Sequence, residues 1–117
     1  MGSEKMFKQG NLFKSLPNAR INEVFEDLVK HPFVRIERIV SRGQTSPETG
    51  WYDQDENEWV VVLQGSAELT FESGEVMPLQ AGDHVNIPAR TKHKVSWTEP
   101  EKETVWLAVF YPSVDAE

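Results

Sequence analysis

The sequence contains no cysteine. Disulfide bonds, thiolate metal sites and cysteine nucleophiles are therefore excluded. No apolar run approaches the roughly 20 residues that a membrane-spanning helix needs. Residues 1–10 lack the apolar centre of a signal peptide. These absences favour a cytoplasmic protein without a membrane partner.

Runs of lysine or arginine are missing as well. The 117 residues carry 19 acidic and 12 basic side chains, which gives a formal net charge of −7. Nucleic acids and anionic membranes are bound through clustered basic residues that neutralise phosphates. We therefore expect no nucleic-acid partner, and a small molecule is the expected ligand.

Two common catalytic sequence patterns are also absent. The chain has no glycine-rich phosphate loop of the Walker or dinucleotide kind. Ser46 and Ser66 lie in loop or strand context, without the strand–turn–helix elbow that a serine nucleophile uses. The sequence shows no internal repeat and no sign of a second domain.

The first part of the chain, residues 1–32, is predicted to be an N-terminal extension that contains one short helix. Apolar residues at the i, i+3, i+4, i+7 spacing form one helical face. These residues are Ile21, Val24, Phe25 and Leu28. The helix should end before Pro32, because proline disfavours helical geometry in the residue that precedes it.

From residue 33 the apolar period changes to two, which is typical of half-buried strands. Turn residues separate these segments every eight to twelve positions, a spacing that indicates a sandwich or barrel. The expected strands are 34–40, 58–64, 67–72, 76–79, 84–88, 93–97 and 104–111. Residues 33–112 are therefore predicted to form one all-β barrel domain.

Two stretches carry a more specific pattern. In the stretch Trp51 to Gly65, Glu58 is followed seven positions later by glycine. The stretch Gly82 to His93 contains Gly-Asp, three further residues, Ile-Pro, and a histidine five positions after the proline. These spacings resemble the two motifs of the cupin family. The resemblance implies a double-stranded β-helix, or jelly-roll, barrel of the RmlC-like type.

The first motif departs from the family pattern, which has two histidines one residue apart before the glutamate. The longer of two alignments puts Trp51 and Asp53 in their places, and the shorter one puts Tyr52 and Gln54 there. The resemblance thus implies a partial ligand set, against three imidazoles and one carboxylate in the full family set. The candidate metal ligands are Asp53, Gln54, Glu58 and His93. The implied ion is Fe, Mn, Zn or Ni, bound with little selectivity by such an oxygen-rich set.

Three functions remain open for this pocket. The first is a metal-binding cupin that acts as an enzyme on a small polar metabolite, with Glu58 and His93 as candidate catalytic residues. The second is a metal-free ligand-binding or sensor protein. The third is a metal-independent sugar epimerase or isomerase. The candidate substrate-binding residues are Trp51, Tyr52 and Trp97, of which Trp97 is expected to share the inward face of its strand with His93.

Self-association is also expected. The segments 58–64 and 104–111 are apolar on both faces, which is more apolar surface than one small barrel needs. Excess apolar surface of this kind marks interfaces between copies of a chain. The sequence therefore predicts a homodimer.

Overall fold

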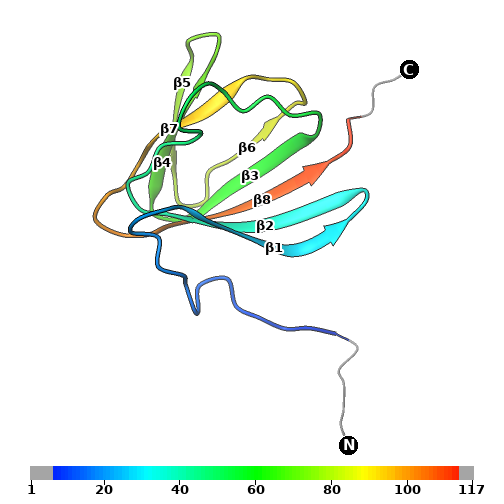
Figure 1. Ribbon diagram of the computed structural model, residues 1–117, viewed down its shortest axis with the longest axis vertical. Coiled ribbons are helices and arrows are strands. Elements are labelled where there is room, and N and C mark those ends of the chain that lie inside the picture. Colours follow the sequence, from blue (N-terminus) through cyan, green and yellow to red (C-terminus); the bar gives the residue numbers. More distant parts are fainter. Residues whose placement is uncertain (1–6, 114–117) are drawn as a thin grey trace, which may run out of the picture.

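The computed structural model describes residues 7–113 of the 117-residue chain. These residues form two antiparallel β-sheets that face each other (Figure 1). Their strands are β1 (Val24–His31), β2 (Val34–Ser41), β3 (Asn57–Gln64), β4 (Ser66–Phe71), β5 (Val76–Gln80), β6 (His84–Ile87), β7 (His93–Thr98) and β8 (Thr104–Tyr111). The larger sheet has the order β1-β2-β8-β3-β6 and the smaller one the order β5-β4-β7. The expected all-β jelly-roll fold is confirmed.

The expected N-terminal helix is wrong, because residues 24–31 form strand β1. This strand pairs with β2 across the two-residue turn 32–33, with His31 opposite Val34. Val24 and Phe25, which the helical pattern placed on one face, point to opposite sides of the sheet. A register shift at Leu28 breaks the period of two that would have revealed the strand.

Strands β2 to β8 follow the expected segments closely. Strand β3 ends at Gly65, where φ is +89° and a Cβ atom would lie 2.4 Å from Oγ1 of Thr104. Glycine is therefore required at this motif position. Strand β6 ends before Pro88, which has no N–H to donate to the neighbouring strand.

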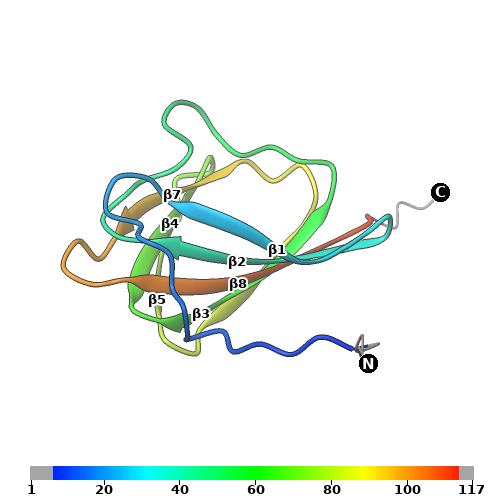
Figure 2. The same ribbon diagram turned by 60° about the horizontal axis from the view of Figure 1, so that its bottom comes forward.

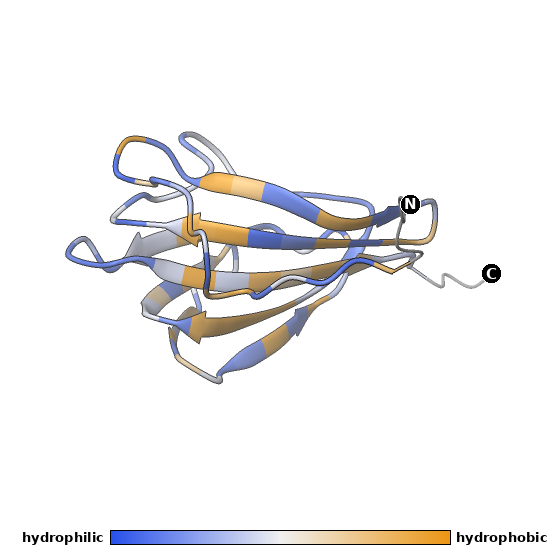
Figure 3. Cartoon of the chain, turned by 90° about the horizontal axis from the view of Figure 1, so that it is seen from below, coloured by the Kyte–Doolittle hydropathy of each residue, from blue (hydrophilic) through white to orange (hydrophobic). Residues whose placement is uncertain are grey.

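The core lies between the two sheets and is built from the inward side chains of both. Its buried members are Ile39, Val60, Val62, Ala67, Leu69, Leu79, Ile87, Trp106, Ala108 and Phe110. Apolar residues run along the strands of the larger sheet, which Figure 3 shows from below. Burial of these side chains supplies the main stabilisation of the fold.

The N-terminal segment crosses the outer face of the larger sheet (Figure 3). The side chain of Arg38 holds it there and is only 7% exposed. Its guanidinium donates to the backbone carbonyls of Leu12 and Lys14 at 3.2 and 3.1 Å. It also pairs with Glu26 on β1. The segment therefore belongs to the folded unit and covers part of the sheet.

The long loop 42–56 runs along the edge of the smaller sheet beside β7 (Figures 1 and 2). Two isolated bridges join them, Ser46 with Val95 and Tyr52 with His93. The loop thus extends the smaller sheet and closes one side of the barrel.

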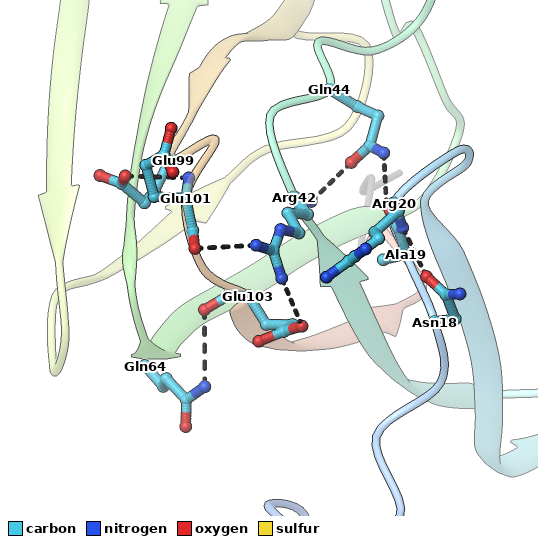
Figure 4. A network of polar contacts seen from close by, with 9 residues as sticks. All are labelled: Asn18, Ala19, Arg20, Arg42, Gln44, Gln64, Glu99, Glu101 and Glu103. Carbon is cyan, nitrogen blue, oxygen red and sulfur yellow. Dashed lines mark hydrogen bonds and ion pairs between the residues drawn. The ribbon is translucent and has the colours of Figure 1, made fainter.

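A polar network anchors the start of this loop (Figure 4). The guanidinium of Arg42 pairs with Glu103 at 3.1 Å and donates to the carbonyl of Glu101 at 3.0 Å. Gln44 accepts from the backbone N–H of Arg42 and donates to the carbonyl of Ala19. These contacts tie the loop to both the β7–β8 connection and the N-terminal segment.

Several large apolar side chains remain exposed, mainly on β1 and in the N-terminal segment. Within residues 7–113 they are Phe7, Phe13, Ile21, Phe25, Leu28, Val29, Phe33, Val76 and Trp97. The expected homodimer stays a prediction. No helix that could cross a membrane occurs in the same residues.

Candidate functional site

A cavity of about 230 Å³ opens between the two sheets. This is the liquid volume of about eight water molecules, so the cavity suits a small ligand. Its lining residues are Glu23, Phe25, Arg35, Glu37, Ile39, Ser46, Tyr52, Gln54, Glu58, Val60, Leu69, Ile87, His93, Val95, Trp106 and Phe110. The walls are mostly apolar, and the polar groups come from Glu23 before β1, from β2, the loop 42–56, β3 and β7.

A pair of ionisable side chains lies at the centre of the polar side. Nε2 of His93 is 3.4 Å from Oε1 of Glu58. The two side chains are only 4% and 12% exposed. They come from the first residue of β7 and the second residue of β3, so both sheets contribute to the pair.

The tautomer of His93 follows from its second contact. Nδ1 lies 2.8 Å from the carbonyl oxygen of Thr91. A carbonyl only accepts hydrogen bonds, so Nδ1 carries a proton and Nε2 faces Glu58 and the cavity. The backbone of His93 is fixed as well, because it exchanges two hydrogen bonds with Tyr52.

The charge of His93 depends on Glu58. Burial, the largest single effect, lowers the pKa of His93. The hydrogen bond to Glu58, the bond to the Thr91 carbonyl and the negative charge of Glu58 together outweigh it. The pKa of His93 is therefore raised above its usual value of 6.5. The raised pKa favours a proton on Nε2, next to Oε1 of Glu58.

The loop 42–56 supplies two further groups. Nε2 of Gln54 donates to Oε1 of Glu58 at 3.0 Å. The ring of Tyr52 lies 5.6 Å from the ring of His93, centroid to centroid. Burial raises the pKa of Tyr52, a hydrogen bond with Ser46 opposes this shift, and the charges of nearby carboxylates add to it. Its hydroxyl is therefore protonated at neutral pH and can donate a hydrogen bond to a ligand.

A second polar cluster lies on β2. Arg35 pairs with Glu37 and, at 2.8 Å, with Glu56. Its guanidinium also lies 4.0 Å from the centre of the Phe110 ring. Burial raises the pKa of Glu37, and Arg35 opposes this shift. Two carboxylates and one aromatic ring of the protein thus contact the guanidinium.

Of the residues singled out from the sequence, Tyr52, Gln54, Glu58 and His93 meet in the cavity. Trp51 and Asp53 alternate with them along the loop and point away. Asp53 pairs with Arg90 at 3.2 Å, and the ring of Trp51 lies under Nζ of Lys94. The shorter of the two motif alignments is thus the one whose residues line the cavity.

Trp97 does not line the cavity and is 43% exposed. The expectation that it faces inward with His93 is wrong. A register shift in the pairing of β7 with β4 places Leu69 opposite Val95 and Glu68 opposite Trp97. Ser96 is therefore an extra residue that reverses the alternation of β7 beyond it.

Three charged lining residues were missed by the sequence reasoning. They are Glu23, Arg35 and Glu37. The only available signal was the alternation of β2, which puts Arg35 and Glu37 on the same face as Ile39. Glu23 precedes β1, and the incorrect expectation of a helix there gave no indication that its side chain faces the cavity.

The cupin resemblance implies a divalent metal ion, and the donor set tests this. Within residues 7–113, no three His, Cys, Asp or Glu side chains gather so that they could hold a metal ion. Tyr52 and Gln54 stand where the family has histidines. The amide nitrogen of Gln54 donates to Glu58, so this carboxylate is already engaged. His93 and Glu58 alone do not fit the site that the family uses.

The sequence of residues 38–110 matches the model of the cupin domain family. The match covers well over half of the chain, and the fold agrees with it. The protein therefore belongs to the cupin family. A comparison with curated proteins finds no match.

Solved structures show the same fold. A protein from Ralstonia eutropha JMP134, named as a proposed mannose-6-phosphate isomerase, is 40% identical with a TM-score of 0.85. The alignment covers 91% of this chain and 99% of that one. An RmlC-like cupin from Desulfovibrio desulfuricans is 21% identical, with 92% and 99% covered and a TM-score of 0.76. One from Methanocaldococcus jannaschii is 20% identical, with 93% and 94% covered and a TM-score of 0.71. The last two similarities concern the fold alone.

Proposed function

We propose that this cupin binds a small carbonyl compound in its cavity and transfers a proton within it, as an isomerase does. The supporting observation is the contact of 3.4 Å between Nε2 of His93 and Oε1 of Glu58 inside the cavity. A buried imidazole beside a carboxylate that raises the pKa of the imidazole is suited to general acid–base catalysis near neutral pH.

Each residue has a defined role in this proposal. When Nε2 of His93 carries no proton, its lone pair can take a proton from the C–H group beside the ligand carbonyl. The hydroxyl of Tyr52 donates to the carbonyl oxygen as negative charge develops there. The carbonyl oxygen takes the proton of Tyr52, and the hydroxyl on the carbon that lost its C–H proton returns a proton to Tyr52 and becomes the new carbonyl. The proton on Nε2 of His93 moves to the former carbonyl carbon. Glu58 stabilises the imidazolium between these two steps.

The name of the Ralstonia eutropha relative supports this reaction class, because the interconversion of an aldose and a ketose is such a proton transfer. The lead expectation from the sequence, a metal-dependent enzyme, is less well supported, since no third His, Cys, Asp or Glu side chain joins His93 and Glu58 in the described part of the chain. A metal requirement would therefore contradict the proposal.

Proton exchange with solvent tests the reaction without knowledge of the product. The protein is incubated in D₂O with dihydroxyacetone, glyceraldehyde, mannose or mannose 6-phosphate, and proton NMR follows deuterium uptake beside the carbonyl. His93→Gln should lower the exchange rate by a factor of about 10² to 10⁴. His84→Gln is the matched control, because His84 is exposed on β6.

Two results would refute this function. One is exchange that proceeds equally fast in His93→Gln and in the wild type. The other is exchange that stops with EDTA and returns with added Zn²⁺ or Mn²⁺. Absence of exchange on all four compounds, and also on aminoacetone as a positively charged carbonyl compound, would favour the metal-free binding protein.

A further inference from the structure

The charges that line the cavity are unevenly compensated. Three carboxylates, those of Glu23, Glu37 and Glu58, face one permanent cation, Arg35, among the described lining residues. Arg35 is engaged by Glu37 and Glu56, and Glu58 is engaged by His93. Glu23 is left without a cationic partner in residues 7–113.

Glu23 is held in place by two buried side chains. The indole N–H of Trp106 donates to Oγ of Ser41 at 3.1 Å. The hydroxyl of Ser41 donates in turn to Oε2 of Glu23 at 2.7 Å. Ser41 is fully buried, and Trp106 is 3% exposed. This chain of hydrogen bonds fixes one carboxylate oxygen and leaves the carboxylate charge at the wall of the cavity.

The surroundings of this carboxylate suit a cation with an apolar body. Aromatic rings of Phe25, Tyr52, Trp106 and Phe110 line the same cavity. A cation gains from aromatic faces as well as from a carboxylate, and it gains more where water is excluded. An anionic ligand would have to compete with Glu37 and Glu56 for Arg35, whereas no cation competes for Glu23 within residues 7–113.

We propose that the cavity selects a ligand with a positively charged nitrogen, which Glu23 binds, over phosphorylated or carboxylated ligands. The substrate class is then a small amino-carbonyl compound. This inference deepens the proposed function, since both concern the same cavity. It departs from a sugar phosphate, the compound that the name of the Ralstonia eutropha relative suggests.

Binding of ligands matched in size tests the selection. Benzylamine, benzyl alcohol and benzoate differ mainly in charge, and mannose 6-phosphate adds a phosphate. Calorimetry with the full-length protein at pH 7 should give benzylammonium about tenfold tighter binding than benzyl alcohol, as expected for a charge-assisted hydrogen bond. Benzoate and mannose 6-phosphate should bind more weakly than benzyl alcohol.

Glu23→Gln removes the charge but keeps an oxygen that can accept the hydrogen bond of Ser41. The variant should fold as the wild type does and lose the tenfold preference for benzylammonium. Glu75→Gln is the matched control, because Glu75 is exposed in the β4–β5 turn. This control should keep the preference unchanged.

The outcomes separate this inference from the proposed function. Tighter binding of benzoate or mannose 6-phosphate, or an unchanged preference in Glu23→Gln, would overturn the inference. His93-dependent proton exchange would then still support the isomerase proposal. Conversely, Glu23-dependent binding of benzylammonium without any exchange would keep the inference and refute the reaction.

Discussion

Substitution of Gly65 tests why the first cupin motif ends in glycine. The residue has φ of +89°, which costs an L-residue about 1–2 kcal/mol. A Cβ atom would also lie 2.7 Å from Cα of Thr104 and 2.9 Å from the carbonyl oxygen of Glu103. Both are backbone atoms at the start of β8, which pairs with β2 and β3, and they cannot move freely, so overpacking adds about 1–3 kcal/mol.

We therefore expect Gly65→Ala to lower the free energy of unfolding by about 2–5 kcal/mol. Gly74→Ala isolates the steric part, because Gly74 has a similar φ of +100° but no atom within 4 Å of the added Cβ. This control should lose about 1–2 kcal/mol. Urea denaturation of both variants measures the difference. Equal losses would refute the steric explanation and leave only backbone conformation.

The remaining predictions concern the cavity, its edge and the assembly. Glu58→Gln should lower the pKa of His93 below 6.5, because burial lowers this pKa more than the bond to Thr91 raises it; an unchanged NMR titration midpoint would contradict this. In the wild type, the stabilisation by the pair should be complete below pH 6.5 and should fall as the pH rises through the raised pKa of His93. Urea titrations across this range should show that the free energies of unfolding of the wild type and Glu58→Gln converge at high pH. A difference between them that does not change with pH would argue against stabilisation by the pair. Trp97→Ser should leave ligand affinity unchanged, because Trp97 lies outside the cavity, so a tenfold loss by calorimetry would be inconsistent with its position. Sedimentation at micromolar concentration should find the homodimer expected from the exposed apolar residues, and a monomer would count against it.

The sequence was sufficient for most of the fold because strands β2 to β8 are short segments rich in β-branched and aromatic residues between clear turn residues. Strand β1 was missed for a physical reason. It is an edge strand with an extra residue at Leu28, so its apolar positions happen to fit a helical spacing. Pairing with β2 overrides that local pattern.

The sequence predicted only part of the candidate site. Motif spacing predicted that Glu58 and His93 meet, and both line the cavity. The orientation of Trp97 depends on one extra residue in β7, which leaves no mark in the hydrophobic pattern. The choice between the two alignments of the first motif depends on the register of the loop with β7, since Tyr52 lies opposite His93.

The pairing of Tyr52 with His93 also bears on how such a pocket changes during evolution. Two residues of a single loop, Tyr52 and Gln54, occupy the places of the missing family histidines, while the barrel strands and Glu58 remain. Tyr52→His together with Gln54→His would restore three imidazoles beside one carboxylate. The full ligand set that the family uses is thus two substitutions away from this sequence, both in one loop.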